Sequence, residues 1–132
     1  MNRTRLTLLV ASTALLLPAA AQAKTVTVKE GANRKLVAIK KGDVLRVQLE
    51  ENPSTGYGWR RTAGPAAVLK YRGSKFFPPP IKPGRPQVVG EGGYRVFRFK
   101  TLSRGKTSFK LGLFPPGRRK PSESYKLTVE VS

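Results

Sequence analysis

The amino-acid sequence predicts an all-β fold, either a sandwich or a barrel, built from seven or eight short strands. From Lys24 onward apolar residues recur with a period of two rather than 3.6, which is typical of strands with one buried face. Glycine and proline separate these apolar runs at short intervals, and no segment has a convincing helical pattern. The strands are expected at residues 25–29, 35–39, 44–49, 57–62, 67–72, 94–100, 106–113 and 124–131.

The strands in the first half of the chain follow from alternation and from the turns between them. Val26 and Val28 share one face of the first strand, and polar residues occupy the other. Leu45, Val47 and Leu49 repeat this pattern against polar neighbours. The turns that divide this half of the chain are expected at Lys41-Gly42-Asp43, Asn52-Pro53 and Gly64-Pro65.

The last three strands show the clearest alternation. Phe97 and Phe99 lie between charged or smaller residues in the first of them. The other two place apolar residues on one face at Phe109, Leu111, Leu113, Tyr125, Leu127, Val129 and Val131. Turns are expected at Gly92-Gly93, Gly105 and Pro115-Pro116-Gly117. Each of these strands therefore has one face suited to solvent.

The segment from Gly73 to Gly93 is the longest stretch without an expected strand, and it contains five prolines. Loops of this length inside a compact domain are usually functional or disordered. The alternative is a polyproline connector that only spans the ends of the sheets. Both interpretations fit the residues.

Residues 1–23 are expected to form a secretory signal peptide. Arg3 and Arg5 precede an apolar run that ends in the small-x-small sequence Ala21-Gln22-Ala23. A membrane anchor is the weaker interpretation, because Pro18 interrupts a run shorter than the about 20 residues that span a bilayer. Cleavage would leave one domain, residues 24–132, with no transmembrane anchor, in the periplasm or secreted.

The mature chain is strongly cationic and contains neither cysteine nor histidine. The formal charge of +19 falls to +17 when Arg3 and Arg5 leave with the signal peptide. The missing residue types remove the common thiol nucleophile, the usual general base near neutral pH and most zinc ligand sets. The sequence therefore predicts a non-enzymatic protein without a cofactor or metal. Because export argues against nucleic acid, an acidic protein or an anionic envelope polymer is the expected partner.

Other catalytic arrangements also lack support. Glu50 and Glu51 are adjacent, but successive strand residues point to opposite faces, so the two carboxylates cannot flank one scissile bond without a bulge. The serines have no histidine to activate them, and a lysine-dependent serine site has no supporting motif. Gly90-Glu91-Gly92-Gly93 leads into a strand rather than a helix, so it does not form a phosphate-binding loop.

The segment Asn52-Pro53-Ser54-Thr55-Gly56-Tyr57-Gly58-Trp59 follows a strand and has the composition of a stiff loop. Asn52 can hydrogen-bond its own backbone, Pro53 fixes φ, and Gly56 allows backbone angles that other residues resist. Stiffness favours binding because the loop is then ordered during folding rather than on association. The alternative is an ordinary tight turn in which Tyr57 and Trp59 anchor the core.

Asn52-Pro53-Ser54-Thr55-Gly56-Tyr57 resembles the Asn-Pro-(Thr/Ser)-Thr-Gly-(Tyr/Phe) signature of the chagasin family of cysteine protease inhibitors, inhibitor family I42. The run from Val89 to Gly93, with the strand 94–100 after it, resembles the glycine-rich loop and Phe-x-Phe strand of that family. Residues 124–131 are similar to its last strand. These matches cover most of the mature chain in order.

The resemblance implies an immunoglobulin-like β-sandwich of seven or eight strands whose three loops enter a protease cleft as a wedge. Ser54 and Thr55 would lie at the tip, beside the catalytic Cys and His of the target. The glycines would line one side of the cleft, and the loop after Leu113 the other. The residues implied to contact the protease are Asn52, Pro53, Ser54, Thr55, Gly56, Tyr57, Gly90, Gly92, Gly93, Phe114, Pro115 and Arg118.

The third loop departs from the family pattern, which is Arg-Pro-Trp. The only tryptophan of this chain is Trp59, and the third loop instead offers Phe114 with Pro115 as an apolar surface and Arg118 or Arg119 as a cation. Losing a Trp anchor at an interface costs about 2 kcal/mol, roughly thirtyfold in affinity. Weak, narrow or lost inhibition remains an alternative.

The function expected from these residues is reversible, non-covalent inhibition of papain-like cysteine proteases. The alternative is a cationic envelope protein that binds anionic polymers such as lipopolysaccharide and inhibits no protease. Lys and Arg occur in every segment, so the charge is expected to be dispersed. It would either solvate the surface or speed the encounter with an acidic target.

Overall fold

The computed structural model describes residues 22–86 and 90–132. The signal peptide predicted at residues 1–23 therefore lies outside the described residues, except for Gln22 and Ala23. Residues 87–89, in the glycine-rich segment, lie outside them as well. No helix in the described ranges is long and apolar enough to cross a membrane.

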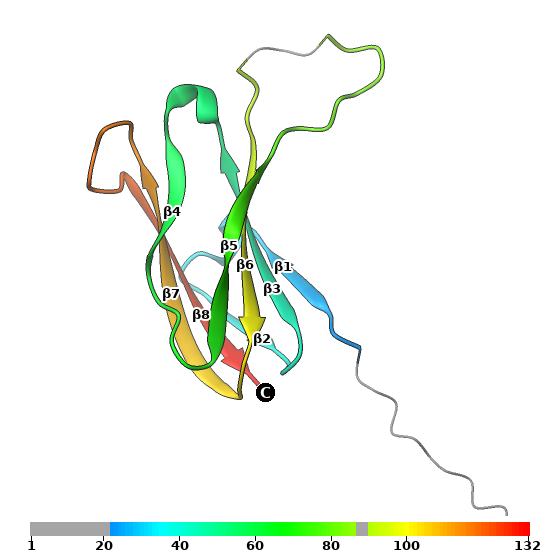
Figure 1. Cartoon of the computed structure of the whole chain (residues 1–132), viewed down its shortest axis with the longest axis vertical. Coiled ribbons are helices and arrows are strands. Elements are labelled where there is room, and N and C mark those ends of the chain that lie inside the picture. Colours follow the sequence, from blue (N-terminus) through cyan, green and yellow to red (C-terminus); the bar gives the residue numbers. More distant parts are fainter. Residues whose placement is uncertain (1–21, 87–89) are drawn as a thin grey trace, which may run out of the picture.

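In the described part of the chain eight strands form two four-stranded sheets, which confirms the all-β fold and selects the sandwich over the barrel (Figure 1). One sheet has the order β1-β3-β6-β5, and the other has the order β2-β8-β7-β4. Strands β1 and β2 pair in parallel with β3 and β8, and the remaining pairs are antiparallel. The strands are β1 (Thr25–Val28), β2 (Leu36–Ile39), β3 (Val44–Glu51), β4 (Gly58–Ala63), β5 (Leu69–Phe77), β6 (Gly93–Thr101), β7 (Gly105–Phe114) and β8 (Glu123–Val131).

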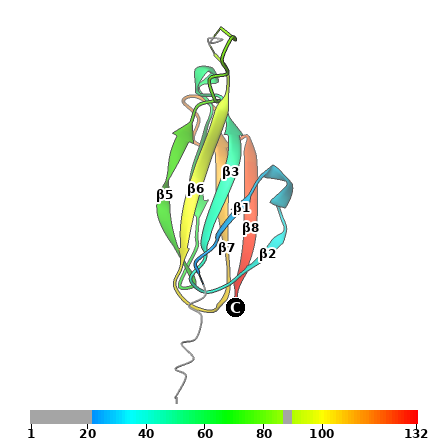
Figure 2. The same ribbon diagram turned by 90° about the vertical axis from the view of Figure 1, so that its right-hand side faces the viewer.

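The apolar face of each long strand packs into the space between the sheets, as the alternation predicts. Phe99 of β6 stacks on Phe109 of β7 with ring centroids 4.2 Å apart, so the two sheets meet directly at these rings. Tyr71 packs beside Phe99 at 5.4 Å. The fully buried side chains include Leu45, Val47, Leu49, Phe97, Leu111, Leu127 and Val129. The core thus runs the length of the sandwich between the two layers. Figure 2 looks onto the sheet of β5, β6, β3 and β1, with β7 and β8 of the other sheet behind it.

The predicted end of the fifth strand is wrong. We expect no strand between residues 73 and 93, but β5 continues to Phe77 and pairs with β6 along Ser74–Phe77. The register shifts between Tyr71 and Ser74, and Gly73 at this shift has a φ of 99°. Gly73 therefore forms a bulge rather than the end of the strand, and the residues after it pair again with β6. The remaining boundaries agree to within two residues.

Within residues 22–86 and 90–132, two short 3-10 helices interrupt the β structure where no helix is expected: η1 (Glu30–Ala32) and η2 (Pro53–Thr55). Each contains three residues, a length at which the isolated 3-10 turn is common. The second lies inside the loop that the sequence identifies as stiff. It therefore supplies the loop with backbone hydrogen bonds of its own.

Two buried polar groups fix the ends of the strands. The carboxylate of Asp43 accepts hydrogen bonds from the backbone N–H groups of Lys40 at 3.0 Å and Lys24 at 3.1 Å, which lower the pKa of Asp43 below 3.8. The hydroxyl of Tyr125 donates to the carbonyl of Lys29 at 2.9 Å. Burial, with a smaller effect of the Glu30 carboxylate, raises the pKa of Tyr125 from 10.0 to about 12.

Candidate functional site: three loops at one pole

Three loops leave the same end of the sandwich, and we call this end the loop pole. They are the first loop, residues 52–57 between β3 and β4, the second loop, residues 78–92 between β5 and β6, and the third loop, residues 115–122 between β7 and β8. Figure 1 shows all three at the top, opposite the C-terminus. The structure thus brings together segments that lie up to about sixty residues apart in the sequence.

The first loop is held by the side chain of Asn52. Its Oδ1 accepts hydrogen bonds from Ser54 N at 3.1 Å and Ser54 Oγ at 2.6 Å. The Asn52 carbonyl accepts from Thr55 Oγ1 at 2.6 Å and from Thr55 N at 3.1 Å. Asn52 also caps η2, which Pro53 begins. Both hydroxyl side chains at the tip are therefore bonded within their own loop.

Gly56 ends this turn in the left-handed region. Its φ is 78°, and its N–H donates to the carbonyl of Pro53 at 3.0 Å. A side chain at this position would be strained, which explains the glycine. The loop is stiff as predicted, and its exposed residues Pro53, Ser54 and Thr55 stand away from the core.

The second loop contacts one side of the first. Asn52 Nδ2 donates to the carbonyl of Gly90 at 2.9 Å. A Cβ built on Gly90 would lie 3.5 Å from Ser54 Oγ, and one on Gly92 would lie 3.4 Å from Asn52 Cβ. These distances are those of ordinary van der Waals contacts, so the two loops lie against each other, and the φ of 87° at Gly90 explains the glycine at that position.

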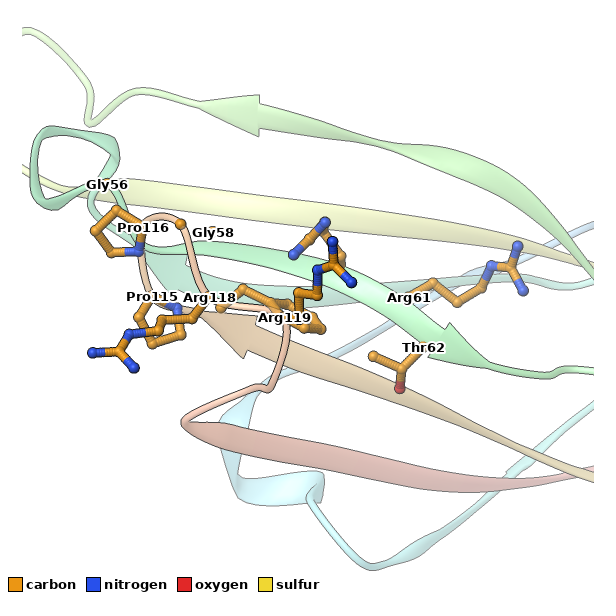
Figure 3. A pocket seen from close by; sticks show the side chains of 11 residues that line it. Gly56, Gly58, Arg61, Thr62, Pro115, Pro116, Arg118 and Arg119 are labelled. Atoms are coloured by element: carbon orange, nitrogen blue, oxygen red, sulfur yellow. The ribbon is translucent and has the colours of Figure 1, made fainter.

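The third loop contacts the other side of the first. A Cβ built on Gly56 would lie 3.0 Å from Pro116 Cβ, so the two residues are in van der Waals contact (Figure 3). The third loop is itself closed by hydrogen bonds, from Arg118 N to Pro115 O at 3.2 Å and from Ser122 N to Leu113 O at 2.7 Å. The first loop is thus the middle of a continuous edge made of three loops.

A buried ion pair fixes the base of the first loop. Glu51 lies on the inner face of β3 with its side chain 2% exposed, and Arg95 Nε donates to both of its oxygens at 2.9 and 2.8 Å. Trp59 N donates to Glu51 Oε2 at 2.8 Å, and Trp59 Nε1 donates to the carbonyl of Glu50 at 2.9 Å. Strands β3 and β4 belong to different sheets, so these bonds join the two sheets directly beneath the loop.

Most of the residues predicted to contact a protease lie on the loop pole. Tyr57 is 39% exposed, so of the two aromatic residues in the segment only Trp59 belongs to the core. Phe114 and Pro115 are half-buried, and Arg118 is exposed. Gly93 is different, because it is a buried residue of β6. A Cβ there would collide with the carbonyl oxygen of Phe77, so the glycine serves strand packing rather than the surface of the loop.

Several residues of the pole were not identified from the sequence. Pro116 makes the contact with the first loop, and Arg60 of β4 stacks on the ring of Phe114 with the guanidinium carbon 3.9 Å from its centroid. Ile81 of the second loop is 78% exposed. The Pro-Pro pair after Phe114 was a usable signal for Pro116, whereas nothing in the local sequence pairs Arg60 with a loop more than fifty residues later.

The fold and the three-loop edge define an immunoglobulin-like β-sandwich of the kind that carries its binding surface on loops at one end. Residues 38–130 match the model of the chagasin family of peptidase inhibitors, family I42, and the chain belongs to this family. Its members inhibit peptidases rather than act as enzymes. The match spans all three loops.

Solved structures agree with this assignment. The chain is similar to the cysteine protease inhibitor EhICP2 from Entamoeba histolytica, with 26% identity, a TM-score of 0.69, and coverage of 83% of this chain and 97% of that one. It also shares its fold with amebosin, with 22% identity, a TM-score of 0.65, and coverage of 83% and 98%. The comparison with curated proteins found no match. Family and fold together support cysteine protease inhibition.

Proposed function

We propose that the protein is a reversible, non-covalent inhibitor of papain-like cysteine proteases, and that the loop pole enters the active-site cleft of the target. The single observation that carries this proposal is the hydrogen-bonded first loop, which lies between and in contact with two flanking loops. A surface ordered before the encounter loses little conformational entropy on binding. Membership of the chagasin family supplies the class of target.

The conformation of the tip explains why the inhibitor would block the protease without being cut. Thr55 N and Gly56 N donate to Asn52 O and Pro53 O, so Pro53–Thr55 forms a tight 3-10 turn. Cleavage requires the scissile carbonyl to be in attack geometry, and a closed turn does not present an extended peptide bond to the nucleophile. The missing side chain of Gly56 leaves room for Pro116, so the third loop can lie directly against the tip.

The two flanking loops would contact the walls of the cleft. Gly90 and Gly92 offer backbone on one side, while Phe114 and Pro115 offer an apolar surface on the other, where the family has its Arg-Pro-Trp motif. Because Phe114 is half-buried under Arg60, this surface is smaller than a free tryptophan would provide. Inhibition is therefore expected to be measurable but weaker than with a tryptophan anchor.

The test uses residues 24–132 and two tryptophan substitutions at exposed serines. Ser54→Trp places a large ring at the tip, and Ser103→Trp places the same ring in the turn between β6 and β7 at the opposite end. Wild-type protein should slow papain and a cathepsin L-type protease at near-stoichiometric ratios, with full recovery of activity after dilution. Ser54→Trp should raise the inhibition constant at least about 100-fold, a change of about 2.7 kcal/mol.

A control variant and a test for cleavage of the inhibitor complete this experiment. Ser103→Trp should change the inhibition constant by less than about threefold, and mass spectrometry should find wild-type protein uncut after incubation with protease. Equal effects of the two substitutions would contradict insertion of the loop pole. Full protease activity in excess wild-type protein would contradict the inhibitor function itself.

We also propose that the protein is exported and that its mature chain begins near Lys24. Lys24 N donates to Asp43 Oδ1 at 3.1 Å, so the first residue after the predicted cleavage site is already bound to the domain. Expression in a bacterium with a functional secretion pathway should yield a chain whose mass corresponds to residues 24–132 in the periplasm or medium. A full-length product in the cytoplasm would contradict this.

A further inference from the structure

Four arginines gather around one hollow of about 790 Å³ beside the loop pole, although they come from two distant segments. Arg60 and Arg61 belong to β4, while Arg118 and Arg119 belong to the third loop. Figure 3 shows the hollow between the edge strand β4 and the third loop, with Gly56 and Pro116 at its end. The sequence predicts a dispersed positive charge. Folding nevertheless brings these four arginines to one hollow.

Among the described residues, the arginines that line this hollow, which we call the arginine groove, have no acidic partner within 4.0 Å. In residues 22–86 and 90–132 the ion pair between Arg95 and Glu51 is the only one within 4.0 Å, and it lies outside the groove. Like charges that line one hollow raise its local positive potential and repel one another unless an anion binds. The groove is thus electrostatically prepared for negative charge from another molecule.

Arg60 is positioned for such a contact, whereas Arg61 is already occupied. The guanidinium of Arg60 lies 3.9 Å from the centroid of the Phe114 ring, which fixes its plane and leaves its N–H groups free for an anion. Arg61 instead donates to the carbonyl of Gly64 at 2.9 Å and covers the ring of Tyr71 at 4.7 Å. The binding groups of the groove are therefore Arg60 with the two arginines of the third loop.

The wall that carries Arg118 and Arg119 is firmly seated on the sheet. A Cβ built on Gly112 would lie 2.9 Å from Pro121 Cβ, so the end of the third loop packs onto β7 where a side chain is absent. Ser122 N and Ser122 Oγ both donate to the carbonyl of Leu113, at 2.7 and 3.2 Å. A loop fixed at its base and closed by a turn presents its arginines at a defined distance from β4.

We propose that the arginine groove binds carboxylates on the surface of the target protease beside its active-site cleft, and so selects papain-like proteases whose cleft has an acidic flank. This inference rests on the proposed inhibitor function. The position of the groove favours a protein over a free polymer, because Gly56 and Pro116 belong both to the groove and to the loop pole. A protease that receives the loop pole would thus bring its own surface against the arginines, whose planar donors match carboxylates.

The test compares two triple variants with the same change in net charge. One variant replaces Arg60, Arg118 and Arg119 with glutamine. The control replaces Lys40, Lys41 and Lys106, which are exposed at the opposite end of the sandwich, with glutamine. Both are assayed against a panel of papain-like proteases of known structure, ranked by the number of carboxylates within about 8 Å of the cleft rim. Thermal unfolding of each variant verifies that it is folded.

The proposal predicts that the groove variant loses at least about tenfold more affinity for acid-flanked proteases than for proteases that lack the acidic flank. The control should change neither by more than about threefold, and only the groove variant should lose most of its dependence on salt. Equal losses in both triple variants, or no loss in the groove variant, would overturn the proposal.

Two further outcomes separate this proposal from its alternatives. If wild-type protein inhibits no protease of the panel, the inhibitor function itself fails and the groove proposal falls with it. Dextran sulfate serves as a soluble polyanion probe. If its binding depends on the three groove arginines while protease inhibition does not, the groove belongs to an anionic polymer and the proposal is wrong.

Discussion

Glu51→Gln tests whether the ion pair beneath the first loop holds the loop pole in place. The substitution keeps the shape of the side chain but removes its charge and turns one of two accepting oxygens into a donor. If the amide oxygen takes the position of Oε2, the bonds from Trp59 N and Arg95 Nε to that atom survive. The new NH2 group then replaces Oε1, 2.9 Å from the Arg95 Nε donor.

The expected loss of unfolding free energy follows from these contacts. Hydrogen bonds to a charged group contribute about 1.5–3 kcal/mol. Breaking a fully buried ion pair costs about 3–5 kcal/mol, but the Arg95 side chain is 26% exposed and can regain water. We therefore expect a loss of about 1.5–3 kcal/mol in Glu51→Gln. Because the pair lies directly under the first loop, the inhibition constant should rise in the same variant.

Urea unfolding followed by tryptophan fluorescence provides the assay. Trp59 is the only tryptophan in the chain, is 8% exposed and donates directly to Glu51, so its emission reports on this site. Glu50→Gln is the matched control, because Glu50 is exposed on the opposite face and should cost less than about 0.5 kcal/mol. Equal stability of Glu51→Gln and Glu50→Gln would refute this account of the loop base.

Three further predictions concern single positions. Gly56→Ala should lose about 1–2 kcal/mol to its positive φ and also weaken inhibition, because the new methyl lies 3.0 Å from a proline of the third loop. Gly42→Ala, with a φ of 99° and open space at the end of the sandwich opposite the loop pole, should lose only stability in a urea titration. Burial raises the pKa of Tyr125 to about 12, so the contribution of its hydroxyl to stability is complete below pH 10 and is lost as the pH rises toward 12. Tyr125→Phe should therefore lose about 1 kcal/mol of unfolding free energy at neutral pH and show a weaker dependence of stability on pH in the alkaline range. The pKa of Asp43 is lowered instead, so its contribution is complete above pH 3.8 and is lost as the pH falls further; Asp43→Asn should unfold at a lower temperature at pH 7 and differ less from wild type in acid.

The strands and the first loop could be predicted from the sequence because both depend on neighbouring residues. Alternation of the kind seen at Leu45, Val47 and Leu49 is a property of the local chain, and all three are fully buried. The stiffness of the first loop likewise follows from Asn52 and Pro53, whose effects reach only a few residues. The fold class therefore required no knowledge of distant contacts.

The remaining features depend on contacts between distant segments. The bulge at Gly73 depends on pairing with β6, so the residues around it give the same signal as a strand end. Alternation along β3 places Glu51 on the inner face, but the Arg95 guanidinium that compensates its charge comes 44 positions later in the sequence. The arginine groove requires β4 and the third loop to be adjacent, and the sequence shows only two separate basic pairs.

The first loop joins strands from opposite sheets, and this links the interior of the domain to its tip. The loop therefore spans the gap between the two sheets, and the contact between Phe99 and Phe109 helps to set the width of that gap. A larger or smaller ring at either position would alter that spacing and so stretch or compress the loop at its two ends. The packing of the core and the geometry of the loop pole are therefore coupled.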